Sequence, residues 1–360
     1  MKNYSVQSVL DWLETKNYLT QRRFAEAYVL SHANMTKLPL YVHFLMGVGA
    51  MLGFICVMGF LFTTIIHYDD IVSLFSVGFI SMLLALLAYY TCRYKTPIWQ
   101  SLGLQSALIL MIVGKVLVVM GFEQLANHSL IPLRVEWAIT LGILLVTLPT
   151  YVLFPNPIDR FLSSTATLTS LLYNSLFLYS TNVTFFGYFC LLMFLAGFLF
   201  IWRNKSLSWS SLNYALVITL CESVLLLPFF SDPSYLKVPS FAFNGVLGIA
   251  LIFLCLILAQ EKRQLFGIST LLACLAVLAL AFVSTPGILL ALGLLILGYA
   301  KHEMALNIIG GAFLCLFLIL FYYELPFTLD YKAALLISTG VIMLAIRLFV
   351  KLMRWDDSES

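Results

Sequence analysis

Long apolar stretches separated by short polar breaks run along this chain from about residue 38 to its end. A membrane-spanning helix needs about 20 mostly apolar residues to cross a hydrocarbon layer about 30 Å thick. Hydrophobic residues make up 62% of the 360 positions and charged residues 10%, against about 25% charged residues in a typical soluble domain. A soluble fold of this composition could not cover its surface with polar groups. The pattern therefore predicts an all-α, polytopic transmembrane helix bundle.

We place about twelve spans within residues 38–352, using that length as the criterion. In chain order they are residues 39–66, 71–91, 98–121, 133–154, 161–180, 184–202, 209–230, 241–260, 265–284, 287–300, 304–322 and 333–352. The tenth is short, and we expect it to be either a full crossing or a re-entrant half-helix. The breaks between spans hold only a few residues each. Any function is therefore expected inside the bundle, at its mouths or on the N-terminal segment.

Residues 1–37 are more polar and carry an amphipathic helical pattern. Val6, Val9 and Leu13 recur at the spacing of one helix face. We predict a short cytoplasmic helical hairpin, which would serve either as a membrane-surface anchor or as a docking site for a membrane-protein partner. Residues 353–360 are predicted to form a cytoplasmic tail.

Basic residues indicate how the bundle is oriented. With both chain ends in the cytoplasm, all of the 20 Lys and Arg residues fall in or beside inner segments, except Lys115, Arg134, Lys237 and Lys332. Cytoplasmic loops of membrane proteins carry just such an excess of Lys and Arg. The sequence therefore predicts an N-in/C-in topology.

Charged side chains within the predicted spans are candidates for function, because a charge in a bilayer is costly. Lys115 lies about six residues from the outer end of the third span, and Glu222 lies about eight residues from the outer end of the seventh. At about 1.5 Å per residue, the two lie at nearly equal depth. If these helices are neighbours, the two side chains can pair and offset much of each other's desolvation. The alternatives are a purely structural pair and a Lys115 that snorkels to the interface.

Other charged residues lie near the same outer boundary. Arg134 and Glu136 begin the fourth span, and Lys332 leads into the last one. Together with the two charges above, they predict a ligand or ion site in the outer half of the bundle. A cavity lined by a few convergent polar groups is the usual form of such a site.

The sequence contains no motif for catalysis or for a cofactor. It lacks a paired-histidine zinc motif, a phosphate-binding loop and the nucleophile elbow of hydrolases. The seven cysteines include no CxxC pair, and most lie in apolar runs, as small packing residues do. We therefore expect no enzymatic activity, cofactor, metal or nucleic-acid partner.

Three segments resemble a known family. Residues 38–42, 156–162 and 321–325 are similar to parts of the bacterial multi-pass inner-membrane family known as domain of unknown function 4401. The resemblance implies a bacterial inner-membrane protein of uncharacterised role. If the family has a functional surface, the resemblance adds Tyr323 to Lys332 as a candidate. Tyr323 fits an aromatic belt at the membrane interface equally well.

Two functions fit these observations. The first is a secondary transporter or lipid flippase that uses the charges in the outer half as its substrate or ion site. The alternative is a non-enzymatic scaffold or assembly partner in a membrane complex, docked through the N-terminal hairpin or the lipid-facing helices. A transferase acting on a lipid-linked substrate would need a convergent acid, base or nucleophile, and the sequence shows none.

The topology can be tested with reporter fusions. Reporters placed after Arg93, Arg203 and Lys262 should report the cytoplasm, and those after Asp70 and Asn182 the opposite compartment. The measurement is the activity of a reporter that works on only one side of the membrane. Reporters that fail to alternate would contradict the predicted topology.

Overall fold

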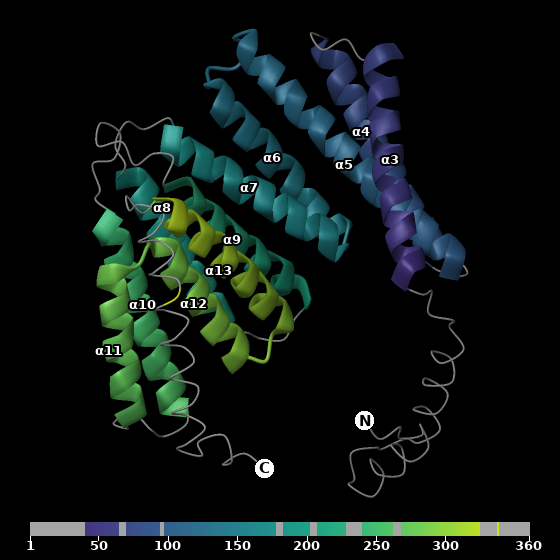
Figure 1. Ribbon diagram of the computed structural model, residues 1–360. Coiled ribbons are helices and arrows are strands. Elements are labelled where there is room, and N and C mark those ends of the chain that lie inside the picture. Colours follow the sequence, from purple (N-terminus) through teal and green to yellow (C-terminus); the bar gives the residue numbers. More distant parts are fainter. Residues whose placement is uncertain are drawn as a thin grey trace, which may run out of the picture. The chain divides into compact units, whose positions relative to one another are not determined.

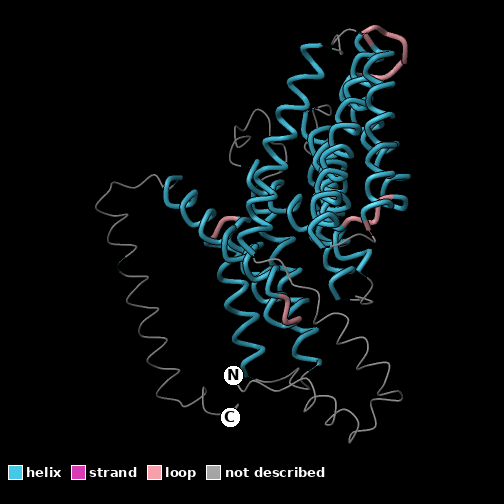
Figure 2. Tube along the Cα trace, turned by 90° about the vertical axis from the view of Figure 1, so that its right-hand side faces the viewer, coloured by secondary structure: helices cyan, strands magenta, loops and turns pink. Residues whose placement is uncertain are grey.

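The computed structural model describes residues 40–64, 70–93, 97–177, 183–201, 207–227, 240–261, 268–324 and the single residue 337. Within these residues the regular secondary structure is entirely helical (Figures 1 and 2). Eleven described helices, α3 to α13, coincide within a few residues with the first eleven predicted spans. The predicted hairpin, the predicted span 333–352 and the predicted tail lie outside the described residues.

Length and apolar composition make this chain a membrane protein. Five described helices are long and apolar enough to cross a bilayer, and they are α4 (Ile71–Cys92), α5 (Pro97–Asn127), α6 (Val135–Leu153), α8 (Val183–Ile201) and α10 (Ser240–Glu261). Shorter apolar stretches lie in α3 (Leu40–Thr64), α9 (Leu207–Leu226), α11 (Ile268–Val283), α12 (Pro286–Ala300) and α13 (Met304–Glu324). Large apolar side chains also lie on the surface, such as Phe282 and Val152, which are 88% and 74% exposed. Such exposure suits contact with lipid.

The chain divides into two compact units, residues 1–170 and 171–360. In the first unit, α4 and α5 pack side by side, and α3 and α6 both pack against α5 (Figure 1). The core of this unit includes Leu74, Met111 and Phe154, all fully buried. α5 is therefore the helix against which α3, α4 and α6 are arranged.

Two glycines allow α4 and α5 to approach closely. A Cβ atom on Gly114 would lie 2.7 Å from the carbonyl oxygen of Gly78, and one on Gly78 would lie 3.1 Å from the carbonyl oxygen of Gly114. Side chains of Met82 and Val118 lie closer still, but because backbone atoms also obstruct both positions, moving a side chain aside would not make enough room. Small residues at such crossings are the usual means of close helix packing in membranes.

The start of α7 (Pro157–Phe177) differs from the other helices of the first unit, because its buried residues there are polar. Asp159, Ser163 and Ser164 are all less than 9% exposed. α7 was predicted to begin at residue 161, after a polar inner loop. The structure starts it earlier, so that Asp159 lies within the helix.

α12 lies at the centre of the second unit. It contacts α9, α10, α11 and α13 (Figure 1), and residues 287–291 are all buried. Its 15 residues span only about 22 Å, less than the bilayer thickness. Tyr214 of α9 also reaches the turn before α13, where its hydroxyl donates a 3.0 Å hydrogen bond to Glu303 Oε2.

Gly114→Ala tests the close contact of α4 and α5. We expect it to lower the free energy of unfolding by about 1–3 kcal/mol, because the added methyl group overpacks the crossing. The melting temperature in detergent measures this. Gly53→Ala is the matched control, because a Cβ there meets nothing within 4 Å. Equal stability of the Gly114 variant and the wild type would contradict the described packing.

Candidate functional site

The first turn of α7 is set by residues 156–159. The Asn156 side-chain oxygen accepts a 3.0 Å hydrogen bond from the backbone N–H of Ile158, and Pro157 is the first residue of the helix. Asparagine before the helix and proline at its first position are both strongly favoured. An acidic residue in the first turn is stabilised by the helix dipole. The local sequence therefore fixes Asp159 at the N-terminus of α7.

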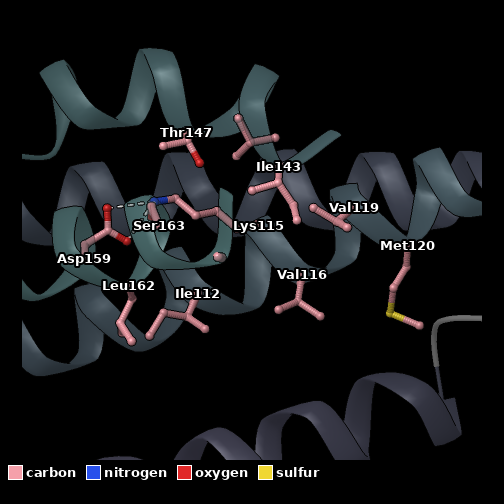
Figure 3. Close-up of a pocket in the computed structure, with 12 residues that line it drawn as sticks. Ile112, Lys115, Val116, Val119, Met120, Ile143, Thr147, Asp159, Leu162 and Ser163 are labelled. Carbon is pink, nitrogen blue, oxygen red and sulfur yellow. Dashed lines mark hydrogen bonds and ion pairs between the residues drawn. The ribbon is translucent and has the colours of Figure 1, made fainter. Parts of the chain in front are cut away.

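Lys115 of α5 reaches this carboxylate. Its Nζ donates to both Asp159 oxygens, at 2.8 and 2.7 Å, and to Ser163 Oγ at 2.7 Å. The side chains of Lys115 and Asp159 are only 13% and 2% exposed. Figure 3 shows the lysine extended along the cavity toward both partners on α7. The site is thus a buried ion pair with a serine hydroxyl beside it.

All three donors of the ammonium group are satisfied by these contacts, since a lysine offers three N–H groups and no acceptor. Removing two charges from water costs several kcal/mol per ion in a low-dielectric environment. Attraction between the charges offsets that cost only when geometry and hydrogen bonding are good. The pair therefore holds α5 and α7 together, provided that both members are present.

A cavity of about 380 Å³ adjoins the pair, between α5, α6 and α7. Its lining is mainly apolar, from residues such as Val116, Met120 and Ile143, and its polar side chains are Lys115, Asp159, Ser163 and Thr147 (Figure 3). The volume lies within the range of small-molecule sites, about 300–1,000 Å³. The arrangement provides an apolar chamber with one charged end.

Further polar contacts join α6 to α7 beside the cavity. The Thr140 and Ser170 hydroxyl oxygens lie 2.6 Å apart. Arg160 Nε donates to the carbonyl oxygen of Tyr151 at 2.9 Å, and the guanidinium lies 4.8 Å from the centre of the Tyr151 ring. These contacts fix the two helices at both ends of the cavity wall.

The predicted partner of Lys115, Glu222, is not the residue that the structure places beside it. Glu222 lies on α9, in the second unit, within electrostatic range of Tyr188 on α8. The helix that carries Lys115 also ends later than the predicted residue 121. α5 continues to Asn127, because Gln124 and Ala126 pack inside the unit, so Lys115 lies near the middle of the helix.

Of the other predicted site residues, the structure describes the side chains of Arg134 and Glu136, and neither is among the described residues that line the cavity. Arg134 precedes α6 and its Nε lies 3.9 Å from Glu136 Oε2, with side chains 67% and 35% exposed. Exposed pairs of this kind contribute little to stability. Lys332 and the side chain of Tyr323 lie outside the described residues. A ligand role for these four residues stays a prediction.

Asp159 and Ser163 were missed in the sequence, although a signal for Asp159 is present. Asn156-Pro157 followed by an acidic residue is a helix start, and it would have placed the carboxylate inside a span. Ser163 carries no such signal, because serine is common in helices of membrane proteins. Among the described residues, no group of three or more His, Cys, Asp or Glu side chains could hold a metal ion.

A double-mutant cycle tests the ion pair. Lys115→Met and Asp159→Asn should each destabilise the protein by about 3–5 kcal/mol, because each leaves an unpaired buried charge. The double variant should cost less than the sum of the two single variants. Unfolding free energies in detergent give the coupling between the two residues. Additive effects would show that the two charges do not interact.

Comparison with known proteins gives a family but no characterised relative. Residues 39–353 match the family described as domain of unknown function DUF4401. No curated protein and no solved structure matches the chain. Since the match covers most of the sequence, this chain belongs to the DUF4401 family.

Proposed function

We propose that this protein moves an amphiphilic molecule across the bacterial inner membrane, as a secondary transporter or lipid flippase. The observation that carries the proposal is the buried Lys115–Asp159 pair at the end of an apolar cavity between α5, α6 and α7. Charged residues within membrane helices mark substrate and ion pathways by default. An amphiphile matches the cavity, because its chain suits the apolar lining and its head group suits the ion pair.

The position of the Lys115–Asp159 pair along α5 supports a role in transport. Lys115 lies near the middle of α5, whose 31 residues extend about 46 Å. A head group that reaches Lys115 has therefore left the membrane surface. Binding sites near the bilayer midplane are typical of secondary transporters.

The edge of the cavity supports entry of a lipid from the surrounding bilayer. Two of its lining residues, Val116 and Leu162, are 37% and 43% exposed. Both are apolar, so this edge suits contact with acyl chains. A lipid could keep its chains in the bilayer while its head group enters the cavity.

We also infer that the bundle crosses the membrane about twelve times, with both ends in the cytoplasm. Support comes from the eleven described helices that coincide with predicted spans and from the distribution of Lys and Arg. The scaffold alternative depends on the N-terminal hairpin, residues 1–37, which lies outside the described residues. The cavity favours transport over that alternative.

The test is lipid movement in reconstituted vesicles. Wild-type protein should transfer fluorescent phospholipid between leaflets faster than protein-free vesicles do, measured by quenching with an impermeant reductant. The Lys115→Met/Asp159→Asn variant should lose at least about tenfold in rate, because the head group loses both charged partners. Ser164→Ala is the control, since Ser164 is buried on α7 next to Ser163 without lining the cavity. A wild-type rate equal to that of empty vesicles would contradict the proposal.

A further inference from the structure

The charged end of the cavity contains one group of each sign. Among the described residues that line the cavity, Lys115 and Asp159 are the charged ones, and they form an ion pair with each other. Their hydrogen bonds and their burial leave little room for a third charge to join an intact pair. A charged ligand must therefore take the place of one partner or of both.

The sign of the ligand decides how favourable that exchange is. An anion that binds Lys115 alone would leave Asp159 as an unpaired carboxylate in an apolar cavity, and a cation on Asp159 would leave Lys115 unpaired. Breaking a buried pair by removing one partner is strongly unfavourable. A zwitterion avoids this penalty, because its anionic group can bind Lys115 while its cationic group binds Asp159.

The cavity lining also discriminates between kinds of cation. Quaternary ammonium groups have no N–H donors and are recognised mainly by cages of aromatic side chains. None of the described residues that line this cavity is aromatic. The Asp159 carboxylate accepts hydrogen bonds, and it already receives two from the Lys115 ammonium. A primary ammonium can replace those two bonds, whereas a quaternary one cannot.

Hydroxyl groups complete the match to a phosphate. Ser163 Oγ lies 2.7 Å from Lys115 Nζ, and Thr147 also lines the cavity (Figure 3). Both hydroxyl groups can donate to the oxygens of a phosphodiester that replaces the Asp159 carboxylate as the partner of Lys115. The apolar lining around Val116 and Met120 would then take the adjoining chain.

Resting on the proposed function, we infer that the substrate of this cavity is a zwitterionic phospholipid with a primary ammonium group. Its ammonium would face Asp159, and its phosphodiester would face Lys115 and Ser163. Phosphatidylethanolamine is the simplest probe with this chemistry. Phosphatidylcholine lacks the N–H donors, and phosphatidylglycerol lacks the cation.

Lipid binding in detergent tests this inference without requiring transport. Native mass spectrometry of the full chain should show phosphatidylethanolamine bound about tenfold more tightly than phosphatidylglycerol or phosphatidylcholine of the same acyl chains. The Lys115→Met/Asp159→Asn variant should lose the preference. Equal or tighter binding of phosphatidylglycerol by the wild type would overturn the inference, as would a preference that survives in the double variant.

Serine variants give a second test that does not depend on the stability of charge-altered proteins. Ser163→Ala should weaken binding of phosphatidylethanolamine several-fold, because one donor to the phosphodiester is lost, while Ser164→Ala should leave it unchanged. Equal effects of the two substitutions would overturn the assignment of Ser163.

The proposed transport function and the proposed substrate can be contradicted separately. Selective binding in detergent without lipid movement in vesicles would support the substrate and contradict transport. Lipid movement at equal rates for all three head groups would support transport and contradict the substrate.

Discussion

The ion pair between Lys115 and Asp159 is the interaction on which the account of the first unit depends. A lone lysine in the middle of an apolar helix is expensive to bury, and here all three of its donors are occupied by Asp159 and Ser163. The pair joins α5 to α7 across the wall of a cavity that is otherwise mainly apolar. Because both charges are desolvated, loss of either partner is strongly unfavourable. The same cost would be avoided by a ligand that gives each charge a new partner.

The helices position this pair by ordinary membrane packing. Gly78 and Gly114 allow α4 and α5 to approach to backbone contact, and the next residue after Gly114 is Lys115. The face of α5 that carries Gly114 therefore lies against α4, while the Lys115 side chain extends toward α7. On the other side, the Asn-Pro start of α7 places Asp159 in the first helical turn. Neither element provides the site alone, because each charge needs the other for a partner.

The helices could be predicted from the sequence, whereas the pairing of the charges could not. Bilayer thickness sets span length, so hydropathy located all eleven described helices. Lys115 was recognised because a charge in an apolar run is conspicuous. Asp159 was not, because it sits beside a polar break and is 44 residues away in sequence, and hydropathy contains no information on which helices are neighbours. Glu222 was chosen from equal depth alone, and the end of α5 was placed at residue 121, although buried Gln124 continues the helix to Asn127.

Solid-state NMR of the protein in lipid bilayers tests the central interaction most directly. Labelling the side-chain nitrogen of lysine and the carboxyl carbon of aspartate allows the dipolar coupling between Lys115 Nζ and Asp159 Cγ to be measured. Direct contact, with N···O distances near the 2.7 and 2.8 Å of the structure, should give a strong coupling that is lost in Asp159→Asn. A lysine nitrogen with no coupling to Asp159 in the wild-type protein would contradict the ion pair.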